Sequence, residues 1–404
     1  MTEIRGVAPP FRKARANAAD FWRLWYVGLV VFTVRWLETV AVGVVVYQLT
    51  GSAFLVAMMT MLRLLPMGLF GGFIGELAER LDRRLALIGV VAMMAATSAL
   101  LAVVAWMGRL EVWHLALASF VNGFGWAADN PLRRVMIGDI VGRERMSWAM
   151  SLDVGASNAS RMIGPIVGGV LLAGIGIEGA FLLSVVLYAT AIGAGLAVRA
   201  HSPSTIGAGP VLARTLEGFA VVLADKRLTA TMVVTIIYNL FAWPFTSMIP
   251  VIGRDQLTLG PEGVGILAGL DGVGAFVGAL LLAFLLTPRW YAHAYVGGLA
   301  CYTAALIVFA LASDPIVAGA ALLVTGLGGA GYATLQATIV YLAAPPEMRS
   351  RVLGVLSVCI GTGPIGFVWL GWLADQIGAP DATAITGALG LLAVAATFPL
   401  WRRI

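Results

Sequence analysis

The chain has 404 residues, of which 60% are hydrophobic and 12% are charged, with a formal net charge of +5 and a mean hydropathy of +0.92. Soluble domains carry roughly 25% charged residues, and a chain of this size could not hide so much apolar surface from water. The composition therefore excludes a soluble globular protein.

Twelve apolar stretches have about the 20 residues that a helix needs to cross a bilayer. The predicted spans are 22–47, 52–74, 85–107, 112–135, 147–173, 179–198, 228–251, 263–286, 292–311, 315–343, 350–374 and 382–400. We therefore expect an all-α membrane protein with 12 transmembrane helices.

The basic residues predict the orientation in the membrane. Nearly all of the 26 Lys and Arg residues lie in the two tails and in alternate loops, whereas the opposite loops contain Arg109 and Arg254. Because basic loops stay in the cytoplasm, we expect a multi-pass protein of the inner membrane with both termini, including a tail over 1–20, inside the cell. The positive charge follows from this topology and from anionic headgroups, so we expect no nucleic-acid partner.

One long polar connection, residues 199–227, divides the chain into an N-terminal bundle (21–198) and a C-terminal bundle (228–404). Within it Leu212, Leu216, Phe219 and Val222 recur at helical spacing. This pattern favours a short amphipathic helix along the cytoplasmic membrane surface, with a simple tether as the alternative.

The two halves also resemble each other in sequence. At an offset of about 205 residues, Gly125-Trp126-Ala127 matches Gly331-Tyr332-Ala333, and a basic loop closes the fourth span of each half. Parallel repeats of this kind form two similar six-helix bundles with a cavity between them that opens to one side at a time. The repeat therefore suggests alternating access.

Several segments resemble the major facilitator superfamily, in particular its branch of proton-driven exporters that includes the enterobactin exporter. They are Tyr47-Gln48-Leu49-Thr50-Gly51-Ser52, Leu62-Arg63-Leu64-Leu65-Pro66, residues 75–84, residues 139–145 and residues 346–351. The resemblance covers nearly the whole chain. It implies a monomeric transporter in a lipid bilayer, with a small-molecule substrate and protons as partners.

The loop after the second span is expected to be a cytoplasmic gate, because in this superfamily it latches the two halves together. The predicted gate residues are Gly75, Glu79, Arg80, Asp82, Arg83, Arg84, Arg133 and Arg134. By the resemblance, Glu79 would face Arg133 or Arg134 and the positive end of the eleventh helix near Arg349. A solvated loop that obeys only the positive-inside rule is the alternative.

The fifth span resembles the antiporter motif of the family's exporters, with Ser at two positions where Gly is usual. The motif residues are Ser151, Ser160, Gly164, Pro165, Gly168 and Gly169. Small residues allow close helix packing, and Pro165 can bend the span. The motif favours export over import, although membrane helices are rich in Gly and Pro in any case.

Charged residues within the spans are the candidate centre of the mechanism. An ionised side chain at the bilayer centre costs about 2.5 to 3.5 kcal/mol, so such residues usually face a cavity or a partner. Five lie at this depth: Arg35, Glu38, Arg63, Arg161 and Asp271. Arg35 and Glu38 are three residues apart and can pair on one helix, and Arg63 joins them in one predicted cluster.

Arg161 and Asp271 lie at similar depth on the fifth and eighth helices, which face each other in the superfamily. We expect them to pair across the central interface, with fixed pairing inside each half as the alternative. Glu38 and Asp271 are the candidate proton carriers, with Glu38 the first choice. The protonation state of a buried carboxylate beside arginines depends on its surroundings, so the approach of a substrate can switch it.

Other polar residues within the spans are weaker candidates, because such side chains more often join helices than bind a ligand. The candidate cavity-lining residues are Asn122, Asp129, Asn158, Tyr238, Asn239, Trp243 and Gln336.

No spacing in the sequence is typical of a metal site, a phosphate-binding loop or a catalytic constellation, so we expect no cofactor, no metal and no enzyme activity. The sequence favours proton-coupled export of a small amphiphilic molecule of drug or siderophore type. An importer or uniporter of a metabolite is the alternative within the same fold. A lipid-modifying enzyme and a non-transporting receptor are the alternatives from other classes.

Overall fold

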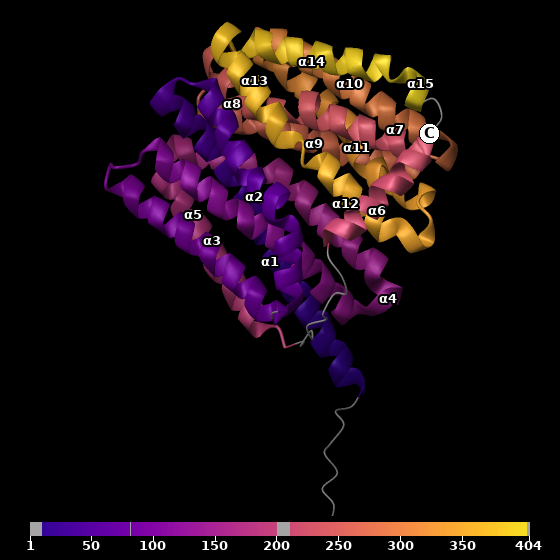
Figure 1. Cartoon of the computed structure of the whole chain (residues 1–404). Helices are drawn as coiled ribbons and strands as arrows, with labels where there is room; N and C mark the ends of the chain where they lie inside the picture. The colour runs from indigo at the N-terminus through magenta and orange to yellow at the C-terminus, as the bar shows by residue number, and fades with distance from the viewer. Residues whose placement is uncertain (1–9, 81, 200–210, 402–404) are drawn as a thin grey trace, which may run out of the picture.

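The computed structural model describes residues 10–80, 82–199 and 211–401, which are almost entirely helical and contain no strand (Figure 1). The helices of the first half are α1 (Pro10–Thr50), α2 (Ala53–Arg80), α3 (Arg83–Trp106), α4 (Val112–Gly174) and α5 (Ile177–Ala197). Helix α1 begins at Pro10, well before its expected start at residue 22, so the end of the predicted tail is helical.

Helix α4 contains two predicted spans, 112–135 and 147–173, and reverses direction at Gly142. Gly142 has φ 72° and ψ 174°, a conformation that essentially only glycine adopts without strain. The reversal brings Arg133 into an ion pair with Asp153, 20 residues further along the chain. A straight helix would hold them about 30 Å apart. Helix α4 therefore consists of two antiparallel legs.

The second half follows the linker. Its elements are α6 (Val211–Ala224), α7 (Lys226–Ile237), η1 (Tyr238–Ala242), η2 (Trp243–Ser247), α8 (Ile249–Asp255), α9 (Pro261–Leu285), η3 (Pro288–Trp290), α10 (Tyr291–Leu311), α11 (Pro315–Ala343), η4 (Pro346–Met348), α12 (Arg349–Ile360), α13 (Gly363–Ile377), α14 (Ala379–Ala396) and α15 (Phe398–Trp401). Two predicted spans are thus interrupted: 228–251 runs from α7 to α8, and 350–374 covers α12 and α13.

The interruption between α7 and α8 has a local cause. A π-helical turn over Tyr238–Ala242 passes directly into a 3₁₀ turn over Trp243–Ser247. Pro244 lies in the second of these turns, where its ring and missing N–H prevent a regular α-helix. Such breaks are common at functional sites, and this one lies beside the central cavity described below.

Ten helical segments of the described chain are long and apolar enough to cross a membrane. The two legs of α4 correspond to the two remaining predicted spans. Large apolar side chains point outward from several of these helices: Leu100 is 67% exposed, Phe284 83% and Ile316 81%. Surfaces of this kind are suited to lipid and not to water.

Helix α6 packs on the second half. Val222 is buried in a cluster with Val355 and Leu356 of α12, and Phe219 packs against the same cluster. Glu217 forms an ion pair with Arg351. Leu216 points away and is 60% exposed, while the side chain of Leu212 lies outside the described residues. Of the expected apolar face of α6, Phe219 and Val222 therefore pack against the cluster that includes residues of α12, whereas Leu216 is exposed.

Glycines let the two halves approach closely where the second leg of α4 meets α9. A Cβ added at Gly265 would lie 3.0 Å from the Cα of Gly169, and one added at Gly269 would lie 2.8 Å from the carbonyl oxygen of Met162. Small residues serve this purpose in membrane helices, where backbones pack against each other directly. This contact forms the wall behind the candidate site.

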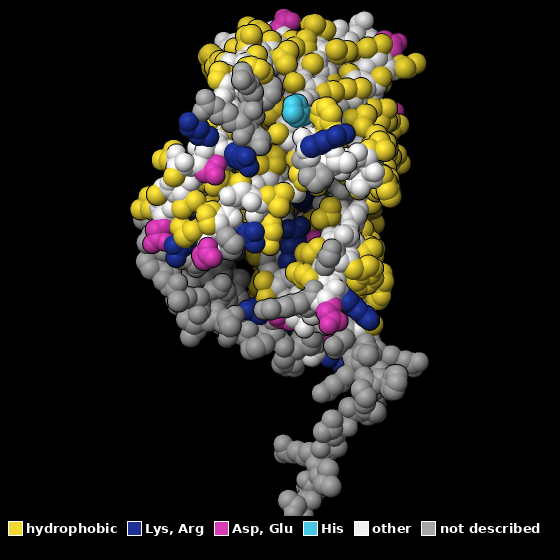
Figure 2. All heavy atoms as spheres, turned by 90° about the vertical axis from the view of Figure 1, so that its right-hand side faces the viewer, with side chains coloured by type: hydrophobic (Ala, Val, Ile, Leu, Met, Phe, Trp, Pro, Cys, Tyr) yellow, Lys and Arg dark blue, Asp and Glu magenta, His cyan; other side chains and the backbone are white. Residues whose placement is uncertain are grey.

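The face that carries α15 is hollowed. Figure 2 shows Lys and Arg side chains around and inside this hollow, with Asp and Glu side chains among them. A cavity rimmed by basic residues at one end of the bundle agrees with the uneven charge distribution of the loops.

Candidate functional site: a charged cavity between the halves

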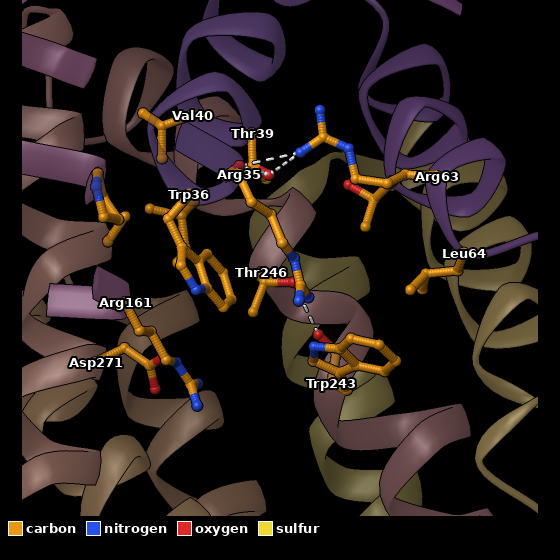
Figure 3. Close-up of a pocket in the computed structure, with 14 residues that line it drawn as sticks. Arg35, Trp36, Thr39, Val40, Arg63, Leu64, Arg161, Trp243, Thr246 and Asp271 are labelled. Atoms are coloured by element: carbon orange, nitrogen blue, oxygen red, sulfur yellow. Dashed lines mark hydrogen bonds and ion pairs between the residues drawn. The ribbon is translucent and has the colours of Figure 1, made fainter. Parts of the chain in front are cut away.

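A cavity of about 50 Å³ lies between the two halves, and both contribute to its walls (Figure 3). Its lining residues are Arg35, Trp36, Thr39 and Val40 of α1, Thr60, Arg63 and Leu64 of α2, Arg161 and Pro165 of α4, Trp243 and Thr246 of η2, Ile249 of α8, and Ala268 and Asp271 of α9. Four of these residues are charged. The cavity therefore brings together all but Glu38 of the five charges predicted within the membrane.

Arg161 and Asp271 form an ion pair across the cavity, as expected from their positions on facing helices. The Asp271 side chain is 4% exposed and that of Arg161 20%. The Nε atom of Arg161 and the Oδ1 atom of Asp271 have no hydrogen-bond partner in the described part of the protein. The pair therefore joins the halves and keeps polar atoms available for water or a ligand.

The expected pair between Arg35 and Glu38 does not form. The Arg35 guanidinium lies over the ring of Trp126, 3.6 Å from its centroid, and 5.2 Å from that of Trp36. The two aromatic faces attract the cation, so Arg35 turns away from the acid one helical turn along its own helix. Arg63 donates instead to backbone and hydroxyl oxygens of α1, at 3.0 Å to Arg35 O and 2.5 Å to Thr39 Oγ1.

Glu38 lies inside the first half and not on the central cavity, but it shares a small chamber with Arg35 and Arg63, in agreement with the predicted cluster of these three residues. It is 2% exposed, and its carboxylate accepts hydrogen bonds from Ser98 at 2.6 Å and Asn122 at 3.1 Å. A small chamber of about 10 Å³ borders Glu38 and is lined by Val31, Arg35, Glu38, Arg63, Met94, Asn122, Trp126 and Tyr188. Arg35 and Arg63 line both this chamber and the central cavity.

The antiporter-type motif packs the second leg of α4 between α1 and α9. A Cβ added at Gly164 would lie 2.7 Å from that of Trp36, and one added at Gly168 would lie 2.7 Å from Leu37 O. Gly169 faces α9 instead. Pro165 lines the central cavity, and Ser160 hydrogen-bonds to Thr33 of α1 at 2.9 Å, whereas Ser151 is exposed.

The described part of the predicted gate is bound within the first half. Asp82 caps α3 by accepting from Leu85 N at 2.9 Å. Arg83 pairs with Asp139 at 3.1 Å, and Arg84 donates to Gly195 O at 3.2 Å. Gly75 lies in α2, and the side chains of Glu79 and Arg80 lie outside the described residues.

Arg133 was expected at the gate and Asp129 at the cavity, but the two form a buried ion pair in the first half. Arg133 pairs with Asp129 at 3.2 Å and also with Asp153, and all three side chains are at most 1% exposed. Arg134 is half-exposed and shares Asp153 at 3.2 Å. The pairs of Arg133 and Arg134 with Asp153 join the two legs of α4, and Asp129 adds a second compensating charge for the buried Arg133.

The second-half candidates form an aromatic and polar cluster of their own. Tyr238 stacks on Tyr332 with 3.7 Å between ring centroids, and Asn239 donates to Thr235 O at 2.8 Å. Gln336 donates to Tyr332 OH at 2.5 Å. Of the four second-half residues predicted to line the cavity, Trp243 alone does so. Asn158 of the first half is partly buried outside it.

Eight lining residues of the central cavity were not among the candidates predicted from the sequence: Trp36, Thr39, Val40, Thr60, Leu64, Thr246, Ile249 and Ala268. Trp126, whose ring lies beside the Arg35 guanidinium, belongs to the repeated Gly-Trp-Ala segment, but no role in the site was predicted for it from the sequence. The signal for Thr39 was its position one turn after Arg35, on the same helix face.

The profile of the transmembrane secretion effector family matches residues 10–402. Macrolide efflux protein A of Streptococcus pyogenes is 23% identical over 403 residues, covering 95% of this chain and 96% of that protein. The staphyloferrin A transporter of Staphylococcus aureus is 19% identical over 367 residues, covering 88% and 90%.

Solved structures resemble the whole fold. A bacterial homologue of the human lysosomal transporter Spinster, solved in an inward-facing and unoccupied conformation, superposes with a TM-score of 0.77 at 16% identity over 98% of both chains. The nucleoside transporter NupG gives 0.74 at 13% identity over 95% of this chain and 99% of that one. The all-α fold with two bundles is thereby confirmed, and the chain belongs to the transmembrane secretion effector family of major facilitator transporters.

Proposed function

We propose that the chain exports small amphiphilic molecules by alternating access, in exchange for protons. The observation that carries this proposal is the charged cavity shared by both halves, with the Arg161–Asp271 ion pair joining them. A charge pair across two packed bodies is suited to a carrier, because it can form in one state and separate in another. The macrolide efflux and staphyloferrin relatives support export of this substrate class.

The size of the cavity also supports a moving mechanism. Drug-sized ligands occupy pockets of about 300–1,000 Å³, whereas this cavity measures about 50 Å³. The halves must therefore separate around the site before a drug-sized molecule can bind. The hollow at the face that carries α15 marks the route by which that opening would begin (Figure 2).

Glu38 is the proposed first proton carrier, and Asp271 the second. A proton on Glu38 removes a negative charge from the chamber that Arg35 and Arg63 also border. Because the same arginines line the central cavity, a charge change at Glu38 alters the electric field at the substrate position. This arrangement supports coupling between the chamber inside the first half and the cavity between the halves.

The proposed setting is a monomer in the inner membrane with both termini in the cytoplasm, and with residues 199–227 joining bundles 21–198 and 228–404. Its gate would be the C-terminal end of α2, with Gly75, Glu79 and Arg80, together with Asp82 at the start of α3, at the basic end of the bundle. The support is the distribution of Lys and Arg residues among the loops.

Everted membrane vesicles test the proposal. Respiration acidifies their interior, and an acridine dye reports the pH gradient by fluorescence quenching. Erythromycin, a macrolide, and staphyloferrin A are the probes. Their transport in exchange for protons should restore fluorescence in vesicles that carry the protein, but not in those with Glu38→Gln. Probe movement without proton release would support the uniporter alternative, and movement in the opposite direction would support import.

A further inference from the structure

At one end of the bundle the second half caps a helix of the first. Asp375 of α13 accepts a hydrogen bond from Phe54 N, in the first turn of α2, at 3.0 Å. Its second carboxylate oxygen accepts one from Ser52 Oγ at 2.8 Å. Ser52 belongs to the short turn that joins α1 to α2, and Phe54 is the second residue of α2.

A helix start leaves backbone N–H groups without partners, and a nearby side chain of the same turn usually satisfies them. Ser52 does so for Leu55 N at 3.1 Å. The Phe54 N–H is satisfied from the other half instead. A carboxylate is well suited to this position because the helix dipole favours negative charge there.

A second carboxylate of the second half contacts the end of α1. The Tyr47 hydroxyl donates to Asp255, which closes α8. Arg254 lies beside this bond, with its guanidinium 5.9 Å from the Tyr47 ring centroid. Two acids thus hold the end of α1 and the start of α2, which are joined by Gly51.

These contacts border water-accessible space. A cavity of about 400 Å³ is lined by Tyr47, Ser52, Asp255 and Asp375, among other residues of both halves, and both acids are exposed. Hydrogen bonds that water can replace break at little cost. The hydrogen bonds of Asp375 and Asp255 are therefore exchangeable, although they lie beside close packing between the halves: a Cβ added at Gly371 of α13 would lie 3.1 Å from Phe54 Cα.

We propose that Asp375 and Asp255 form the gate at this end, which the loop charges assign to the outside of the cell. Each acid bonds to the α1–α2 region when the end is closed and releases it when the end opens. Release leaves the first turn of α2 to be capped by water and by Ser52. This inference rests on the proposed alternating access and names the residues that hold one of its two states.

Spin-label distances test the gate without reference to the side of the membrane. Labels at Gln48→Cys and Asp381→Cys, both exposed at this end, would be placed in a protein with Cys301 and Cys359 replaced by Ala. We expect a short distance for the closed state and a longer one for the open state. Asp375→Ala should raise the ratio of long to short roughly tenfold, since a lost helix cap is typically worth about that factor.

Asp314→Ala is the matched control. Asp314 caps α11 at the same end by accepting from Ile316 N at 2.8 Å, but it makes that cap within its own half. Its loss should leave the distance ratio unchanged. Tyr47→Phe removes one hydroxyl with little risk to folding and should shift the ratio in the same direction as Asp375→Ala.

The outcomes separate the gate from the transport mechanism. If the unsubstituted protein shows both distances but neither Asp375→Ala nor Tyr47→Phe changes their ratio, the gate assignment is wrong and alternating access stands. If a single short distance persists in every variant and with erythromycin or staphyloferrin A added, alternating access fails and the gate with it.

Discussion

Arg161 and Asp271 join the second leg of α4 to α9, and so tie the first half of the molecule to the second. The ion pair lies where glycines bring the two helices into backbone contact: a Cβ added at Gly272 would be 2.8 Å from Arg161 O. A tightly packed interface thus carries a polar contact that can rearrange.

Substituting one residue of this ion pair should destabilise the protein more than substituting both. Asp271→Ala leaves Arg161, whose side chain is 20% exposed, without its partner, which should cost less than the roughly 3–5 kcal/mol typical of a fully buried pair. The double variant Arg161→Gln with Asp271→Asn should recover much of the lost thermal stability in detergent. A double-mutant cycle measures the coupling, which we expect to be about 1–3 kcal/mol.

Additive losses in that cycle would show that the two residues act independently. Exchange of the charges, Arg161→Asp with Asp271→Arg, should restore folding but not transport, because the arginine then lies on the opposite wall of the cavity.

Glu38→Gln should abolish proton coupling and leave the protein folded. Glutamine keeps the shape of the side chain. Its amide oxygen can still accept from Ser98, and its NH2 group can donate to Asn122 Oδ1, which has no partner in the described part of the protein, once the Asn122 amide turns over. Proton release from everted vesicles measures the effect, with Glu178→Gln at the start of α5 as the control. Normal coupling in the Glu38 variant would exclude this acid as an essential carrier.

Gly169→Ala should disrupt the contact between the halves. The added Cβ would meet Pro261 O and lie 2.9 Å from Gly265 Cα, so one helix must move. We expect a melting temperature lower by several degrees. Gly155→Ala on the same leg of α4 has no atom within 4 Å of the new Cβ and should be neutral or mildly stabilising. Equal effects of the two would contradict the packing described here.

Arg133→Ala should destabilise the first half strongly. It would leave Asp129 and Asp153 buried without their main partner, at a typical cost of about 3–5 kcal/mol or a failure to fold. Arg134→Ala, whose side chain is 46% exposed, should cost within about 1 kcal/mol. Thermal unfolding of the two variants under matched conditions compares them, and a smaller loss at Arg133 would disprove its buried role.

The sequence predicted the helical spans well because twenty apolar residues have few alternatives in a membrane. It did not predict the break at Tyr238–Ser247, since the apolar pattern continues through it. It also did not predict the reversal of α4 at Gly142, where helix continues almost to the turn on both sides.

The candidate site was predicted in part. The depth of Arg161 and Asp271 along their helices predicted their pairing correctly. On two helices that face each other, oppositely charged residues at the same depth in the membrane lie close enough to pair. The spacing of Arg35 and Glu38 was misleading. It shows that the two residues share a helix face, but it does not show which side chains of the neighbouring helices bind them. Trp126 and Ser98 come from α4 and α3, and they decide where these two side chains point.

Asp375 escaped notice for a similar reason. Its role depends on the start of α2, more than 300 residues earlier in the chain, and neither segment carries a distinctive motif. Contacts between the halves are set by tertiary packing, which a single sequence does not display.

The most direct test of the account follows a cysteine inside the cavity. Thr246→Cys, in a protein without Cys301 and Cys359, would be treated with a membrane-impermeant maleimide from each side of the membrane in turn. The account predicts labelling from the cytoplasmic side at rest, and labelling from the outer side in a fraction that grows when Asp375→Ala is added. Labelling from neither side, or from both sides at equal and unchanging rates, would contradict a cavity that opens alternately between the two halves.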